Sequence, residues 1–496
     1  MRHRIRETGP QCGCTSRRSF LADFGMGFTG LALGSLLNAD GVARGSELGV
    51  WTPPTGDPLW TPKAKRVIWV FLSGGYSHME TFDPKPALNK YAGKTIEETP
   101  FPNPFEDPLH DARSRSVIEK VREKYSKIFP MQVGFKKHGE SGIEVTDWWP
   151  HLAECVDDIA FVRNMWTSDN DHAAENQIHT GRHKLDETQP SLGAWVTYGL
   201  GTLNQNLPQF IVLGGPTRSD TRESIHSYYL GPQYAGVPLE VDPKNPLPFG
   251  RRAGDVLFDE QQNEFRLLNR LNGLLATEYP DDEALRARIQ SYELAFQMQM
   301  AVPEAIDFSD ETQQTREMYG LDQDVTRVAA QRCLAARRLA ERDVRFIQVY
   351  PSPYGVWDSH QKLKSLHAQR CAEVDQPVAA MLKDLKQRGL LDDTLVVFCT
   401  EFGRTPALEE RSGGTDGRDH HPHGFTVWLA GAGVKQGFVH GATDELGFHA
   451  IKPGHYVTDL HATVLHLMGL DGRRLEIPGR KRLEIDHGKP ILDILT

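Results

Sequence analysis

The most constraining feature of the sequence is a continuous apolar run that ends in a carboxylate and a glycine turn. Residues 395–399 read LVVFC, and Glu401 and Gly403 follow directly. A strand that is apolar on both sides is buried on both faces, as central strands of parallel sheets are. In such sheets, ligands bind at the carboxyl ends of the strands. The run therefore predicts a central strand that presents Glu401 at a binding edge.

Five other apolar runs predict further strands of the same sheet. They contain Val67, Ile159, Phe210, Phe346 and Thr426. Helical patterns lie between several of these runs, and the longest is amphipathic and covers residues 363–388. Strands that alternate with helices predict a three-layer α/β/α sandwich with a mostly parallel central sheet. We expect one domain over residues 49–496, with an insertion of loops and helices at about residues 217–341.

Metal-ligand side chains cluster after the strand predicted at residues 395–399. Asp419, His420, His421 and His423 lie within five positions of one another and follow Glu401 closely. Clustered imidazole and carboxylate groups suit a borderline or hard divalent ion. A solvated, histidine-rich loop is the alternative interpretation.

Other polar residues also follow strand ends. Asp358 and His360 come after the strand at Phe346 and are two positions apart, so both can point to one side of an extended loop. Ser73 follows the strand at Val67. Because carboxyl ends of parallel strands share one edge, these residues are expected near Glu401.

The net charge and the cysteine spacing bear on the partners of the chain and on whether it contains disulfides. The formal net charge of −10 argues against nucleic acid as a main partner. Cys155, Cys333, Cys371 and Cys399 are widely spaced and form no CxxC motif. This spacing predicts free thiols rather than a disulfide framework.

The N-terminus has the pattern of an export signal. Arg17 and Arg18 precede a mildly apolar, glycine-rich run over residues 25–37, and this order resembles a twin-arginine signal. An amphipathic first helix is the alternative. The run is short and broken by glycine, and no other stretch is long enough to span a membrane. We expect residues 1–48 to be a signal and short linker read by the twin-arginine export machinery, and a periplasmic or extracellular mature chain without a transmembrane segment.

Five motifs follow one another along the chain: FLSGGYSH, VWDSH, TEFGRTP, GRDHHPHGF and DLHATVLHLMGL. Together they resemble the family termed domain of unknown function 1501, within the alkaline-phosphatase-like superfamily. The resemblance covers nearly the whole chain after the signal. It implies an alkaline-phosphatase-like fold and assigns no activity.

Shorter segments resemble sulfatases and alkaline phosphatases. Residues 372–404 look like the helix, turn and strand that lead to a sulfatase metal motif, with Glu401 at the start of that motif. The spacing from Asp171 to Arg182 is similar to that of the sulfatase nucleophile box, and a box of alkaline phosphatases fits equally well. Asp171, or His172 in a shorter loop, occupies the place of the nucleophile, where those enzymes have Cys or Ser. The superfamily mechanism therefore does not transfer whole.

The resemblance implies a metal centre with one or two divalent ions, for which we expect zinc or calcium. Such ions would neutralise the ester oxygens and activate a water molecule. The implied ligands are Asp358, His360, Glu401, Asp419, His420 and His423.

The resemblance also implies catalytic and substrate-binding roles. In one alternative, Asp171 would be a nucleophile that forms a mixed anhydride. In the other, His172 would be a general base or simply a further ligand. Arg182 or Arg404 would hold a tetrahedral oxyanion through paired hydrogen bonds, and Ser73 would contact the substrate. For Arg404, a salt bridge to the glutamates at positions 409 and 410 is the alternative.

These features predict an exported, metal-dependent hydrolase that acts on sulfate or phosphate esters of small molecules or glycans. The absence of the usual nucleophile favours a second hypothesis of a different class. In it, a catalytically degenerate protein keeps the fold and binds a glycan or a cell-envelope partner without turnover. Ester hydrolysis that depends on Asp358 and Glu401 would separate the two.

Overall fold

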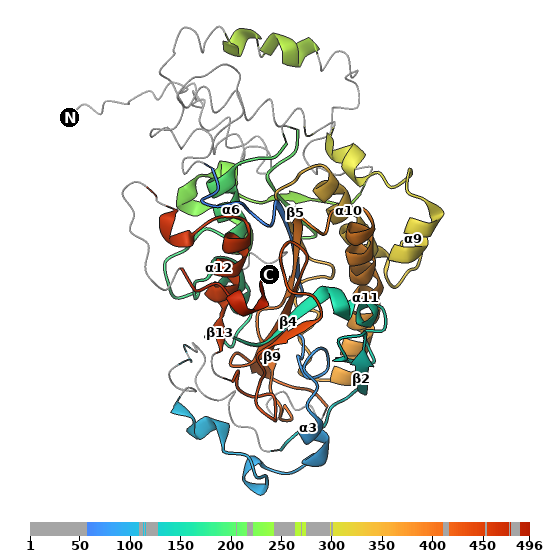
Figure 1. Ribbon diagram of the computed structural model, residues 1–496, viewed down its shortest axis with the longest axis vertical. Helices are drawn as coiled ribbons and strands as arrows, with labels where there is room; N and C mark the ends of the chain where they lie inside the picture. The colour runs from blue at the N-terminus through green and yellow to red at the C-terminus, as the bar shows by residue number, and fades with distance from the viewer. Residues whose placement is uncertain are drawn as a thin grey trace, which may run out of the picture.

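A computed structural model describes residues 57–108, 113, 115, 127–204, 206–215, 222–242, 263–268, 270–273, 298, 301–409, 416–451, 454–475, 477 and 487–496 (Figure 1). The predicted export signal, residues 1–48, lies outside these ranges. So does much of the predicted insertion at about residues 217–341. Among the described residues, no helix combines the length and apolar character needed to cross a membrane.

The described residues form a nine-stranded sheet in the order β12-β4-β11-β8-β1-β7-β5-β6, with β13 also beside β4. The six predicted strands are the contiguous centre of this sheet, from β4 to β5. All pairings are parallel except those of β11 with β8 and β4, which confirms a mostly parallel sheet. The strands are β1 (Arg66–Phe71), β4 (Ile159–Trp166), β5 (Phe210–Leu213), β6 (Val237–Leu239), β7 (Phe346–Val349), β8 (Thr394–Cys399), β11 (Phe425–Ala430), β12 (Phe438–His440) and β13 (His455–Tyr456).

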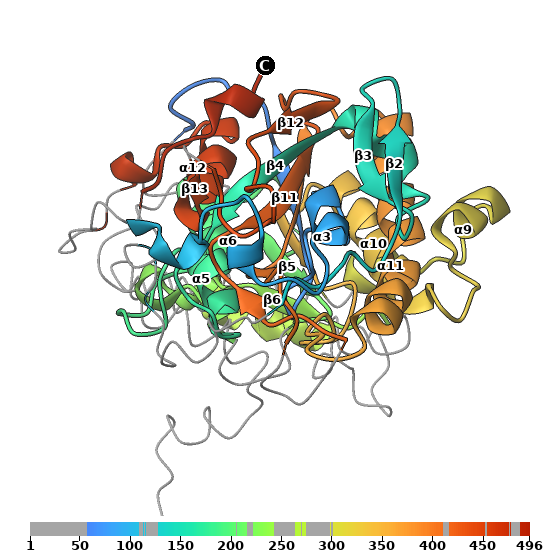
Figure 2. The same cartoon turned by 90° about the horizontal axis from the view of Figure 1, so that it is seen from below.

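Helices cover both faces of the sheet, so the predicted three layers are present (Figures 1 and 2). One face carries α9 (Gln313–Tyr319), α10 (Arg327–Glu341) and α11 (Leu363–Gln387). The other face carries α5 (Ala174–Thr180), α6 (Leu192–Leu200) and α12 (Val457–Leu467). Smaller elements are α3 (Pro86–Lys90), the hairpin of β2 (Phe135–His138) and β3 (Ile143–Thr146), and the pair of β9 (Gly403–Arg404) and β10 (His420–His421).

Strand β1 shows why the central runs are continuously apolar. Ile68 and Val70 pack in the core beneath α10 and α11. Val67, Trp69 and Phe71 face the opposite way, into the core beneath α6 and α12. Because successive side chains alternate between two buried layers, every residue of β1 is buried and apolar residues are needed at nearly every position.

Strand direction brings the site-bearing loops to one edge. The parallel neighbours β7, β1 and β8 end there, and β4 runs the same way because β11 is antiparallel to both β4 and β8. The reversed β11 begins at that same edge. The loops after β1, β4, β7 and β8 therefore meet the segment that precedes β11.

The four described cysteines are free, as their spacing predicts, and all four are buried. Burial raises the pKa of Cys155 and of Cys333 to about 12. These thiols therefore behave as core residues rather than as nucleophiles or ligands.

Candidate metal centre

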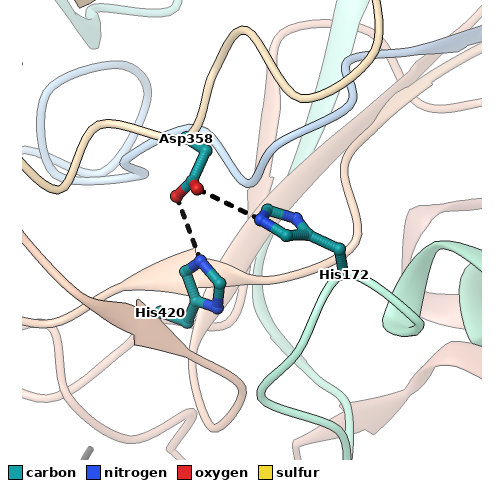
Figure 3. A group of neighbouring side chains, drawn as sticks. All are labelled: His172, Asp358 and His420. Carbon is teal, nitrogen blue, oxygen red and sulfur yellow. Dashed lines mark hydrogen bonds and ion pairs between the residues drawn. The ribbon is translucent and has the colours of Figure 1, made fainter.

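Three imidazoles converge on the carboxylate of Asp358, in the loop after β7. His420 Nε2 lies 3.0 Å from Asp358 Oδ1, and His172 Nε2 lies 3.1 Å from Oδ2 (Figure 3). His360 Nε2 lies 3.0 Å from Oδ1. We term these four residues the His–Asp cluster. It joins the loops after β4 and β7 to β10, three segments that are distant in the sequence.

The opposite ring nitrogen, Nδ1, of each histidine faces an oxygen atom. The pairs are His420 Nδ1 with the Asn170 carbonyl at 2.8 Å, His360 Nδ1 with Glu409 Oε2 at 3.3 Å, and His172 Nδ1 with Glu401 Oε1 at 3.2 Å. Such contacts fix the tautomer and orientation of metal-ligating histidines, and leave Nε2 for the metal.

His420 tests whether these residues fit a divalent ion. Because its Nδ1 faces a carbonyl, Nδ1 carries the proton, and burial lowers the pKa of His420 so that the ring stays neutral. Its Nε2 lone pair then faces Asp358 Oδ1 at 3.0 Å and His360 Nε2 at 3.1 Å. Ligand atoms around a tetrahedral zinc ion are about 3.3 Å apart, for zinc–nitrogen distances of about 2.0 Å. The donor set therefore fits zinc or a similar ion.

The electrostatic field at the cluster also favours a cation. Burial lowers the pKa of His172, but hydrogen bonds to Asp358 and Glu401 outweigh it and raise the pKa to about 9. Burial raises the pKa of Asp358, but the charge of Arg404 and hydrogen bonds from His172 and His360 outweigh it and lower that pKa. Asp358 is therefore a carboxylate at neutral pH.

Arg404 holds Asp358 in place. It is fully buried on β9, where it donates to Asp358 Oδ1 at 2.7 Å and to the carbonyls of Gly74 and Gly75. Pairing of β9 with β10 sets Arg404 opposite His420. The guanidinium thus faces protein oxygens. Of the two glutamates that were its alternative partners, Glu409 contacts His360, and residue 410 lies outside the described residues.

Two further predicted ligands lie immediately behind the His–Asp cluster. Glu401, after β8, is fully buried and also accepts a hydrogen bond from the Gly74 amide at 2.7 Å. Asp419 Oδ1 lies 3.6 Å from His360 Nδ1 and accepts from the His420 amide. Burial and the charge of Glu409 raise the pKa of Asp419 to about 6. Asp419, His360 and His420 are close enough to form a second possible ligand group.

Four predicted site residues contact other partners. His423 packs against the rings of His421 and His449, with centroids 5.3 and 5.4 Å away. Asp171 pairs with Lys184 at 2.9 Å, and Arg182 lies 3.9 Å from Asp186. Ser73 donates to Glu175 at 2.8 Å. The structure does not bring these side chains into the His–Asp cluster.

Sequence reasoning missed the residues that hold the cluster from behind. Asn170 supplies a backbone carbonyl, and a carbonyl leaves no mark in the sequence. Glu409 carried a weak signal, since it lies between Glu401 and the histidine-rich segment that begins at Asp419. Asp169 and His183 form a fully buried pair at 3.3 Å beside Asn170.

Several solved structures are similar to this chain. One is a protein of the alkaline phosphatase superfamily from Vibrio parahaemolyticus, with 10% sequence identity and a TM-score of 0.35. The match covers 93% of this chain and 81% of that protein. A phosphonate monoester hydrolase from Silicibacter pomeroyi has 12% identity, a TM-score of 0.36, and coverage of 70% and 71%. A sulfatase from Pseudoalteromonas sp. has 11% identity, a TM-score of 0.33, and coverage of 89% and 72%. Similarity at this level carries no conclusion about activity.

Comparison with curated proteins gives no match. The profile of one family, described as "Protein of unknown function (DUF1501)", matches residues 64–495, which is most of the chain. The matched region contains every residue of the His–Asp cluster and the whole central sheet. The chain therefore belongs to the DUF1501 family.

Proposed function

We propose that this chain is a metal-dependent hydrolase of sulfate or phosphate esters, with His172, His360, His420 and Asp358 as the metal ligands. One observation carries the proposal. Three Nε2 atoms point at one carboxylate while each opposite Nδ1 faces an oxygen atom. This is the arrangement of oriented histidine ligands, and a group of buried ionisable residues is costly unless it coordinates something.

A bound divalent ion would supply Lewis-acid polarisation of an ester oxygen. The protein would supply orientation. Arg404 would hold the Asp358 carboxylate, and Glu401 and Glu409 would keep the rings of His172 and His360 turned toward it. Lys184 holds the Asp171 carboxylate at 2.9 Å, so this proposal gives Asp171 no covalent step.

A second candidate function is binding of an anionic or glycan ligand without turnover. It is favoured by the engagement of Ser73, Arg182 and Arg404, the predicted substrate contacts, with partners inside the protein. A hydrolase needs charged or polar groups aimed at the transferred group. Without such groups from this set, an ion would be the main attraction for an anionic ligand.

Metal content and turnover should be measured on the same preparations of the full chain. Zinc, manganese or calcium is added, unbound metal is removed, and the retained metal is quantified. Hydrolysis of p-nitrophenyl phosphate and p-nitrophenyl sulfate is then followed. We expect a retained metal ion and saturable turnover, and a loss of about 100-fold or more in kcat/KM in Asp358→Asn together with the metal.

Asp171→Asn is the matched control, because its carboxylate is partly exposed and lies in the sequence beside His172. We expect this variant to keep the metal and most of the turnover. Retained metal without turnover of any ester would support the binding function instead. A chain that retains no metal under any condition would contradict the metal centre itself.

We also propose that residues 1–48 direct export. The support is the Arg17-Arg18 pair ahead of a short apolar run. Replacing both arginines by lysine should keep a fused reporter inside the cell, whereas the native signal should export it. Export of the lysine variant at the native level would contradict a twin-arginine route.

A further inference from the structure

A second histidine pair lies apart from the His–Asp cluster, on two short strands along one edge of β4. β12 pairs with Ala160–Val162 and β13 pairs with Met165–Trp166. His440 ends β12 and His455 begins β13, and their Nε2 atoms face each other at 2.9 Å. Their side chains are 12% and 15% exposed, so an ion can reach the pair from solvent.

Each ring has a carboxylate on the side away from its partner. His455 Nδ1 lies 3.1 Å from Asp459 Oδ2, and the other Asp459 oxygen accepts a hydrogen bond from the Lys489 amide at 2.8 Å. That carboxylate is therefore fixed in position. His440 Nδ1 lies 3.9 Å from Asp493 Oδ2. The Asp459 carboxylate orients the His455 ring so that its Nε2 faces His440, whereas Asp493 lies beyond hydrogen-bond distance of His440.

We propose that His440 and His455 together bind one divalent transition-metal ion, separate from the ion of the His–Asp cluster. Two imidazole ligands suit zinc, nickel or copper and do not suit magnesium or calcium, which prefer oxygen. The nitrogen atoms need to move apart by only a few tenths of an ångström to reach the spacing of about 3.3 Å around a tetrahedral ion. Water would complete the coordination, as it does at the open position of catalytic zinc sites.

The ion would link the end of β12 to the start of β13 and so hold together the two ends of the loop between them. Within residues 441–451 of that loop, the Phe448 carbonyl contacts His421 Nε2 at 2.5 Å, and the Ala450 amide donates to the His423 carbonyl at 2.8 Å. The loop thus packs against the segment that carries His420. Because the pair would be assembled only in the folded chain, metal binding would stabilise the folded state.

Titration of the full chain with Zn²⁺, followed by calorimetry, tests the proposal. Asp358→Asn combined with His420→Gln is used as the background, because the two changes remove a ligand from both possible ligand groups around the His–Asp cluster. We expect one zinc equivalent in this background and its loss when His440→Gln or His455→Gln is added. His466→Gln is the control, since His466 packs against Trp60 elsewhere on the molecule. Equal zinc binding with and without His440→Gln would overturn the proposal.

Asp459→Asn tests the positioning of His455. We expect about tenfold weaker zinc binding, because second-shell carboxylates contribute about this much to affinity. Electron paramagnetic resonance of the same background chain with Cu²⁺ gives a second readout that is independent of calorimetry. Coupling to two equivalent imidazole nitrogens, lost in His455→Gln, supports the pair as a ligand set. A copper spectrum identical in the two proteins means that the facing rings share only a proton.

Discussion

One oxygen atom, Asp358 Oδ1, receives more nitrogen neighbours than hydrogen bonds can satisfy. Arg404 lies at 2.7 Å, and His360 and His420 each lie at 3.0 Å. A carboxylate oxygen has two lone-pair sites, and Arg404 occupies one. The neutral His420 ring presents a lone pair there rather than a proton. Its contact with Asp358 is repulsive unless a cation lies between them.

Glu409 should act through His360 if this interpretation is correct. Its Oε2 lies 3.3 Å from His360 Nδ1. The Glu409 charge orients the His360 ring and increases its basicity, and Glu409→Gln removes that charge. We expect about tenfold weaker metal affinity in the variant, with little change in secondary structure. Competition against a chromogenic chelator measures this affinity directly.

Glu373→Gln is the matched control for Glu409→Gln. Glu373 lies on α11, where it pairs with Arg370 one helical turn away. Its removal should leave metal affinity at the native value. If Glu409→Gln and Glu373→Gln bind metal equally well, Glu409 has no part in orienting His360.

At the scale of elements, the turn after β1 is packed against the loop after β7. Gly74 has φ of +120°, and a Cβ there would lie 2.6 Å from the Asp358 amide nitrogen and 2.7 Å from that of Trp357. Gly74→Ala should therefore cost about 3 kcal/mol or more in free energy of unfolding, through backbone strain and collision. It should also displace Asp358 and weaken metal binding. Chemical denaturation and chelator competition measure the two effects.

Gly389→Ala separates strain from collision. Gly389 follows α11 with φ of +69°, and a Cβ there would meet no atom within 4 Å. We expect a cost of about 1–2 kcal/mol from the left-handed backbone alone, with native metal affinity. Equal costs for the two substitutions would mean that the turn after β1 can relax away from Asp358.

The elements that could be predicted from sequence are those whose cause is local. Six strands were readable because burial on both faces requires continuous apolar residues, as in β1. The long helix ends at Gln387 just before Gly389, as its amphipathic pattern and glycine predict. The reversed direction of β11 left no such local mark, because it depends on pairing with β4 and β8.

At the scale of the whole molecule, the site is assembled from segments that the sequence separates widely. Strand-end reasoning anticipated that Asp358, His360 and His420 meet, because their loops share one edge of the sheet. It could not tell that Lys184 engages Asp171 or that His423 faces His449. Those outcomes depend on side-chain direction, which periodicity does not encode.

The whole molecule also contains buried neutral histidines whose protonation opposes folding. Burial, and then the charge of His461, lowers the pKa of His179 to about 3. Its ring is packed against Phe71, with centroids 4.6 Å apart. Burial likewise lowers the pKa of His78 to about 4. In the unfolded chain both groups return to a pKa of about 6.5. Below that pH the unfolded state binds protons that the folded state does not.

The stability from neutral His179 is therefore complete above about pH 6.5 and is lost as the pH falls toward 3. Each such histidine lowers the free energy of unfolding by about 1.4 kcal/mol per pH unit in that range. His179→Gln should reduce the slope between pH 6 and pH 4.5 by about one proton, as measured by urea denaturation at several pH values. The decrease in free energy of unfolding that His179→Gln causes at pH 7.5 measures the lost packing separately. An unchanged slope would show that His179 is protonated in the folded protein, and that Tyr350 or water stabilises the charge.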